Sequence, residues 1–161
     1  MPDQTLLTLF NETRAKTLWL TDCEPAAALW TPPGTRNSIT WHAGHTFCVV
    51  EQLVQAALRG SSEVPREIPA GWWEAFSWES SPGPEQPLPP LADIRGALIE
   101  QRDRLRAVLT EVDEAQLAAP LPLPEWGPIA SVRRWFVHAL HDESGHGGEI
   151  WLLRKLFARQ R

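Results

Sequence analysis

The chain has 161 residues, of which 43% are hydrophobic and 22% charged, and a chain of this kind can bury a core without help from a disulfide or a structural metal. Its formal net charge is −5 and its basic residues near the C-terminus suit a helix end, so nucleic-acid binding is not expected. No apolar run approaches the roughly 20 residues of a membrane span, and the N-terminus lacks the pattern of a signal peptide. Two cysteines without a CxxC arrangement suit a reducing compartment. We therefore expect a single cytoplasmic domain over 1–161 that binds neither nucleic acid nor a membrane.

Two helices are predicted in the first 60 residues. Apolar residues at three- and four-residue spacing indicate a first helix over about 5–21, after which prolines break the chain. The second helix is predicted over about 38–59, because Asn37 or Ser38 is a suitable N-cap and Gly60 a suitable C-terminal stop. Its apolar residues lie nearly all round the helix, which predicts burial on more than one side.

A long proline-rich connection and two further helices complete the chain. Residues 61–90 form the connection, with a short helical turn expected near 72–76, and its tryptophans indicate that it packs back on the helices. A third helix is predicted over about 91–109 with a ragged extension to 117, and a fourth over about 129–159. Four long helices without a convincing strand pattern predict an all-α fold, a four-helix bundle in which the connection supplies a crossover.

The fourth helix carries ionisable residues on its core-facing side. On a helical wheel His146 lies at the centre of the apolar stripe, with Asp142 roughly 40° to one side and Glu143 roughly 60° to the other. His138 lies near the edge of the stripe and His141 on the far side. Asp142 and His146 stand one helical turn apart, where side chains meet. A buried carboxylate costs several kcal/mol unless something compensates it, and a divalent cation would do so while binding the imidazole.

A third metal ligand has to come from another helix. His45, at mid-length in the second helix, is the best candidate, and His42, one turn earlier, competes with it. Cys48 lies one turn after His45 and could be a reactive thiol or a fourth ligand, although a buried small hydrophobic residue is the favoured interpretation. The alternative for the acidic and imidazole groups of the fourth helix is a buried His–Asp pair without any metal.

At these positions the sequence resembles the DinB/YfiT-like superfamily of metal-dependent enzymes. The run WHAGHT at 41–46 is similar to the family's second-helix motif, in which the later His is a ligand, and to runs in the DinB-like domain of ergothioneine sulfoxide synthases. The run DESGHGGEI at 142–150 is similar to the fourth-helix motif, which usually has two His residues separated by three others. The resemblance implies His45, Asp142 and His146 as metal ligands. It departs from the family at Asp142, where most members have His, although the mycothiol-dependent maleylpyruvate isomerases place Glu there.

The resemblance also implies an up-down-down-up bundle, a homodimer, and a relation to thiol-dependent S-transferases and isomerases that use bacillithiol, mycothiol or glutathione. Three protein ligands leave an open coordination position, and mixed nitrogen and oxygen ligands suit Zn²⁺ or Ni²⁺, with Mn²⁺ or Fe²⁺ as alternatives. We expect the metal to activate a low-molecular-weight thiol, or water, for attack on an electrophilic small-molecule substrate, while Glu143 or His138 orients a ligand or moves a proton. The rival hypothesis is a non-catalytic metal-binding or stress-related bundle protein with no turnover.

Overall fold

The computed structural model describes residues 1–80, 87–121 and 131–160. None of these residues lies in a β-strand, so the prediction of an all-α fold is confirmed. None of the described helices is long and apolar enough to cross a membrane. The helices are α1 (Gln4–Leu20), α2 (Pro25–Leu29), α3 (Ile39–Arg59), α4 (Trp72–Phe76), α5 (Leu91–Glu111), α6 (Glu114–Ala118) and α7 (Val132–Ala158).

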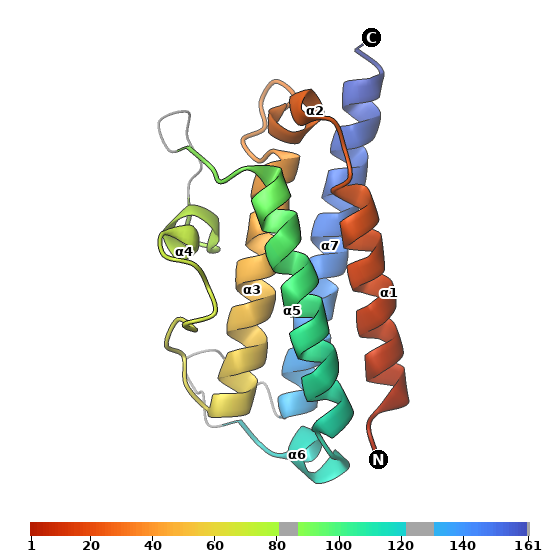
Figure 1. The fold of residues 1–161 in the computed structure, drawn as a ribbon, viewed down its shortest axis with the longest axis vertical. Coiled ribbons are helices and arrows are strands. Elements are labelled where there is room, and N and C mark those ends of the chain that lie inside the picture. Colours follow the sequence, from red (N-terminus) through yellow and green to blue (C-terminus); the bar gives the residue numbers. More distant parts are fainter. Residues whose placement is uncertain (81–86, 122–130, 161) are drawn as a thin grey trace.

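The four long helices, α1, α3, α5 and α7, lie side by side with their axes nearly aligned (Figure 1). In that view α1 and α7 run upward, whereas α3 and α5 run downward. Helix α3 packs against α5 and α7, and α1 packs against the same two helices. The short α2 packs on α3 and α7 at the upper end, α6 on α7 at the lower end, and α4 on the outer side of α3. Helices α3 and α7, which carry the candidate metal ligands, are therefore direct neighbours.

The ends of α3 lie where the sequence predicted them. The Ser38 hydroxyl accepts a hydrogen bond from the Trp41 N–H at 3.2 Å, as an N-cap does. Gly60 ends the helix with a φ of 63°, a left-handed conformation that glycine adopts without strain. Every residue from Ile39 to Ala57 is buried, which confirms the prediction that this helix is covered on more than one side.

Two short helices differ from the sequence-based expectation. Pro25 was expected only to break the chain, but it stands in the first turn of α2, where its missing N–H costs nothing. The ragged extension of the third helix is a separate helix, because Asp113 and Gln116 form a capping box that starts α6. The helical turn expected near 72–76 is present as α4. The predicted start of the fourth helix at 129 lies outside the described residues.

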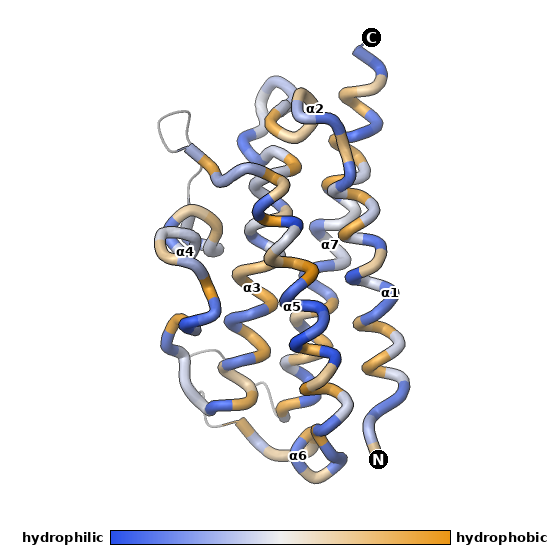
Figure 2. Tube along the Cα trace, viewed as in Figure 1, coloured by the Kyte–Doolittle hydropathy of each residue, from blue (hydrophilic) through white to orange (hydrophobic). Residues whose placement is uncertain are grey.

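Unlike α3, helix α5 buries only one face. In α5 the buried residues recur every three or four positions: Ile94, Leu98, Gln101, Leu105 and Leu109. Figure 2 shows apolar and polar segments alternating along α5 and α7, as expected for helices with one face in the core.

A polar layer crosses the middle of this core, with one residue from each long helix. Arg14 of α1 binds both oxygens of Glu143 of α7, at 2.8 and 3.0 Å, and also donates to Gln101 Oε1 of α5 at 2.8 Å. Gln101 in turn donates from Nε2 to Glu51 Oε2 of α3 at 2.7 Å. All four side chains are fully buried. A buried charge pair of this kind is tolerated only when its partners are satisfied, so the layer fixes how the four helices align along their axes.

Candidate metal centre

Three side chains from α3 and α7 converge on one point inside the protein. His45 Nε2 lies 3.9 Å from Asp142 Oδ2, and His146 Nε2 lies 3.8 Å from the same oxygen. These separations are too long for hydrogen bonds and suit three ligand atoms around a cation. Asp142 Oδ2 is buried and has no hydrogen-bond partner in the described part of the chain. The three residues therefore fit a divalent ion, which would satisfy the oxygen that the protein leaves unsatisfied.

The ring of His45 is oriented by the short helix α4. Its Nδ1 lies 2.6 Å from the carbonyl oxygen of Phe76. A carbonyl only accepts, so Nδ1 carries the hydrogen and Nε2 keeps the lone pair that a metal requires. The Trp41 ring stacks on the imidazole at a centroid distance of 4.6 Å and an interplanar angle of 22°.

Gly44 makes this arrangement possible. A Cβ atom at this position would lie 2.5 Å from the ring of Phe76, closer than two carbon atoms can approach. The sequence places a small residue beside His45, and the structure shows that its role is to admit Phe76 of α4.

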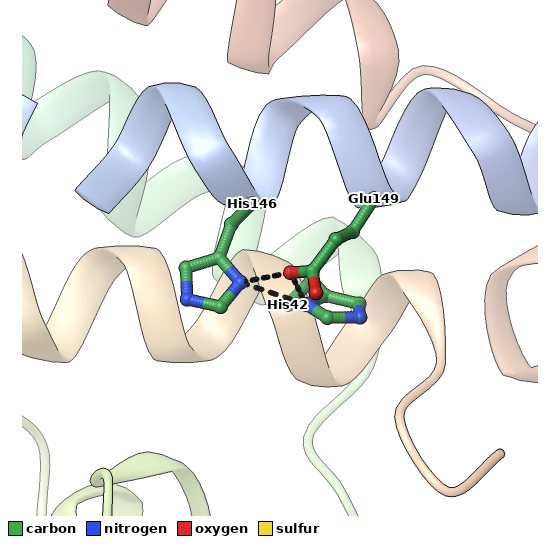
Figure 3. Close-up of side chains that lie close together, drawn as sticks. All are labelled: His42, His146 and Glu149. Atoms are coloured by element: carbon green, nitrogen blue, oxygen red, sulfur yellow. Dashed lines mark hydrogen bonds and ion pairs between the residues drawn. The ribbon is translucent and has the colours of Figure 1, made fainter. Parts of the chain in front are cut away.

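The ring of His146 is held from its other side. Its Nδ1 lies 2.6 Å from Glu149 Oε2 and 3.0 Å from His42 Nδ1, and His42 Nδ1 lies 3.2 Å from the same Glu149 oxygen (Figure 3). The carboxylate accepts, so the His146 Nδ1–H donates to Glu149 and leaves Nε2 free to face Asp142. Both imidazoles thus have an acceptor on Nδ1 and a lone pair on Nε2, the usual arrangement around a protein-bound metal.

Burial keeps the two imidazoles of α3 in the neutral, metal-binding form. Burial, and after it the neighbouring His146 and His45, together lower the pKa of His42 to about 3. Burial and His146 also lower the pKa of His45, against the opposing effects of the Phe76 carbonyl and Asp142. Neither ring has to lose a proton before it binds an ion at neutral pH.

A cavity of about 290 Å³ opens in front of His45 and Asp142. Val49, Leu53 and Trp135 form its apolar wall, while the exposed Trp78 and His138 also line it. Trp78 belongs to the connection between α3 and α5, so this connection supplies one of the residues that line the cavity. His138 lies one helical turn before Asp142. It lines the cavity but does not belong to the group of His45, Asp142 and His146.

The structure does not bring Glu143 to this site. Both its oxygens bind Arg14 in the buried polar layer, so the expectation that it orients a ligand or moves a proton at the metal stays a prediction without a supporting contact in the described residues. The wheel placed Glu143 on the inward side of α7 correctly, but the side chain meets Arg14 of α1 instead of a residue of α3.

Two further expectations concern residues near the site. Cys48 is buried, its sulfur lies 3.7 Å from the Trp72 carbonyl, and burial raises the pKa of the thiol, so it behaves as a packing residue. His141 is exposed, as predicted. Glu149 was not singled out from the sequence, although its three-residue spacing from His146 indicates that the two side chains meet.

Comparison with known proteins identifies the family of this chain. A family model of the DinB superfamily matches residues 9–150. The chain belongs to the DinB superfamily. Its fold is similar to the crystal structure described as a conserved protein of a locus from Enterococcus faecalis, with a TM-score of 0.68, 18% sequence identity and coverage of 97% of both chains. No curated protein is similar enough to this DinB-superfamily chain to count as a match.

Proposed function

We propose that this protein is a divalent-metal-binding member of the DinB superfamily, built as an up-down-down-up four-helix bundle, in which His45, Asp142 and His146 hold one ion. The observation that carries the proposal is the buried, unsatisfied Asp142 Oδ2 with two imidazole nitrogens 3.8 and 3.9 Å away. A His–Asp pair without metal would instead need a hydrogen on Nε2 at hydrogen-bond distance from the oxygen, whereas the Phe76 carbonyl and Glu149 hold the imidazole hydrogens on Nδ1. The nitrogen and oxygen donors suit Zn²⁺ or Ni²⁺, with Mn²⁺ or Fe²⁺ as alternatives.

The reaction that fits this site is transfer of a low-molecular-weight thiol, or of water, to an electrophilic small molecule. Three protein ligands leave a coordination position open, and the bound ion supplies Lewis acidity that lowers the pKa of a thiol or water. The thiolate sulfur forms a bond to the electrophilic carbon, whose leaving group departs with the bonding electrons.

The residues around the cavity have separate parts in that reaction. The apolar wall of Val49, Leu53 and Trp135 excludes water from the reacting atoms. His138, exposed on the cavity, accepts the thiol proton and passes it to solvent or to the leaving group.

Metal content tests the binding part of the proposal. Protein purified without an affinity tag and reloaded should hold about one ion per chain by elemental analysis, and His146→Ala should hold almost none. His141→Ala, an exposed imidazole on the same helix, is the matched control and should bind normally. Less than about 0.1 ion per wild-type chain after reloading would contradict the proposal.

Conjugation assays separate an enzyme from a binding protein. Metal-loaded protein should conjugate bacillithiol, mycothiol or glutathione to an electrophile, or hydrolyse it with water, and lose this activity on His146→Ala. The second candidate, a metal-binding protein without turnover, is favoured by Asp142 in place of the usual His. Metal-loaded protein that is inert with all three thiols and with water would support it.

A further inference from the structure

His146 belongs to two groups of ligand atoms, one on each of its ring nitrogens. Its Nε2 faces His45 and Asp142, as described above. Its Nδ1 faces His42 and Glu149, which form a second group of three potential ligands (Figure 3). We propose that His42 Nδ1, His146 Nδ1 and Glu149 Oε2 form a second divalent-metal position that competes with the first for the His146 imidazole.

The distances in the second group are close to those of a coordination shell. Two ligands about 2.1 Å from a metal and 90° apart are separated by about 3.0 Å. The His42–His146 and His42–Glu149 separations, 3.0 and 3.2 Å, already match this spacing. Only the His146–Glu149 separation of 2.6 Å has to widen, and the Glu149 side chain is 55% exposed, so no buried group has to be displaced.

The second position also has a path for a cation. The His42 side chain is only 5% exposed and fixes the inner side of the group, while Glu149 places a carboxylate at the protein surface. A hydrated ion can therefore meet the carboxylate first and exchange its water for the two imidazoles afterwards. Both nitrogen donors and the carboxylate oxygen are ligand types that suit first-row divalent metals.

Competition follows from the chemistry of one imidazole. A neutral ring has one lone pair, so an ion on Nε2 requires the hydrogen on Nδ1, where Glu149 accepts it. An ion on Nδ1 requires the hydrogen on Nε2, which then faces Asp142 Oδ2 at 3.8 Å. In each case the nitrogen that carries the hydrogen faces a carboxylate of the other position. One ion per chain is the expected stoichiometry, distributed between two positions.

Cobalt titration of full-length variants tests the second position by itself. Co²⁺ is the probe, because its visible absorption reports coordination number and calorimetry gives stoichiometry. The double variant His45→Ala/Asp142→Asn removes the two ligands that belong to the first position alone. We expect it to bind one Co²⁺ per chain, with an affinity within about 100-fold of wild type and a changed absorption spectrum. Adding Glu149→Gln should abolish this binding, whereas adding His141→Ala should not.

The outcomes distinguish the two positions. The variant His42→Ala/Glu149→Gln removes the second position and should still bind one Co²⁺ at the first, with a lower affinity because Glu149 also holds the His146 ring. If it does so while His45→Ala/Asp142→Asn binds none, the second position is refuted and the proposed function stands. If only His45→Ala/Asp142→Asn binds, the proposed function fails and the second position stands. Two Co²⁺ per wild-type chain would refute the competition. Should the double variant fail to fold, His45→Gln/Asp142→Asn, which keeps most of the buried volume, replaces it.

Discussion

At the scale of single residues, the site depends on side chains that set the orientation of others. Phe76 fixes the tautomer of His45 through a main-chain carbonyl, and Glu149 fixes that of His146 through a carboxylate. Gly44 admits Phe76, and no property of glycine other than its missing Cβ is needed for this. Small changes at these positions should therefore alter metal binding without touching a ligand.

Gly44→Ala should weaken metal binding at least tenfold. The added methyl group displaces the Phe76 ring and with it the carbonyl that holds His45. Overpacking should also destabilise the protein by about 1–3 kcal/mol. Gly96→Ala on α5 is the matched control, because a Cβ there meets nothing within 4 Å. Calorimetric titration with Zn²⁺ checks the affinity, and an unchanged dissociation constant for Gly44→Ala would show that Phe76 does not position His45.

His42 makes the metal-free protein sensitive to acid. Its folded-state pKa of about 3 lies below the ordinary value of 6.5, so the unfolded chain takes up a proton between these values. Stability is therefore complete above about pH 6.5 and falls with decreasing pH, by about 1.4 kcal/mol per pH unit for this one proton. Urea unfolding in EDTA between pH 6.5 and 5 measures the slope. In His42→Gln the free energy of unfolding should depend less steeply on pH, because one proton fewer is taken up on unfolding and the contribution of His45 remains. An equal slope in both proteins would contradict the assignment.

At the scale of elements, the four long helices are joined by the polar layer as well as by apolar packing. Glu143 of α7 binds Arg14 of α1, Arg14 binds Gln101 of α5, and Gln101 binds Glu51 of α3. Because the layer has specific partners, sliding one helix along another would break several buried hydrogen bonds at once. Glu143 and Asp142 are adjacent in α7, so the layer also fixes the height at which Asp142 faces His45.

Arg14→Met should destabilise the protein by about 3–5 kcal/mol, because it leaves the Glu143 carboxylate buried without its cation. Adding Glu143→Leu should recover most of this loss. Arg102→Ala, which removes a surface pair with Asp103, should cost less than about 1 kcal/mol. Urea denaturation gives the three values. Metal stoichiometry of the double variant should stay at one per chain, and its loss would mean that Glu143 does take part in the metal centre.

At the scale of the whole molecule, the resemblance to the DinB/YfiT-like superfamily leads us to expect a homodimer. Helices α1 and α7 pack together and leave large apolar side chains exposed, among them Trp19 at 62% and Leu152 at 56%. Exposed apolar side chains on neighbouring helices commonly form the interface between two copies of a chain.

Light scattering after gel filtration should give twice the chain mass of 18.1 kDa. The double variant Trp19→Lys/Leu152→Lys should have the mass of one chain, since the two lysines place charge on the apolar surface. The exposed Ile99 on α5 is the control, and Ile99→Lys should leave the dimer intact. A wild-type mass of 18.1 kDa at high protein concentration would show that the expectation of a dimer is wrong.

The sequence by itself determined the helical content and most helix ends. Apolar spacing predicts each long helix, and Ser38 and Gly60 mark the ends of α3 because capping and left-handed backbone are local properties of the chain. The inward side of α7 was predictable for the same reason, since the angles around one helix follow from its own periodicity.

Only the tertiary structure decided what each inward residue meets. A helical wheel gives directions around one axis, but it does not give the neighbouring helix in each direction or the axial offset between segments about 100 residues apart. For this reason Glu143 meets Arg14 while the adjacent Asp142 faces His45. The choice between His42 and His45 was open from the sequence for the same reason. The structure places both beside His146, on opposite nitrogens of one ring, because the register of α3 against α7 sets the imidazole midway between them.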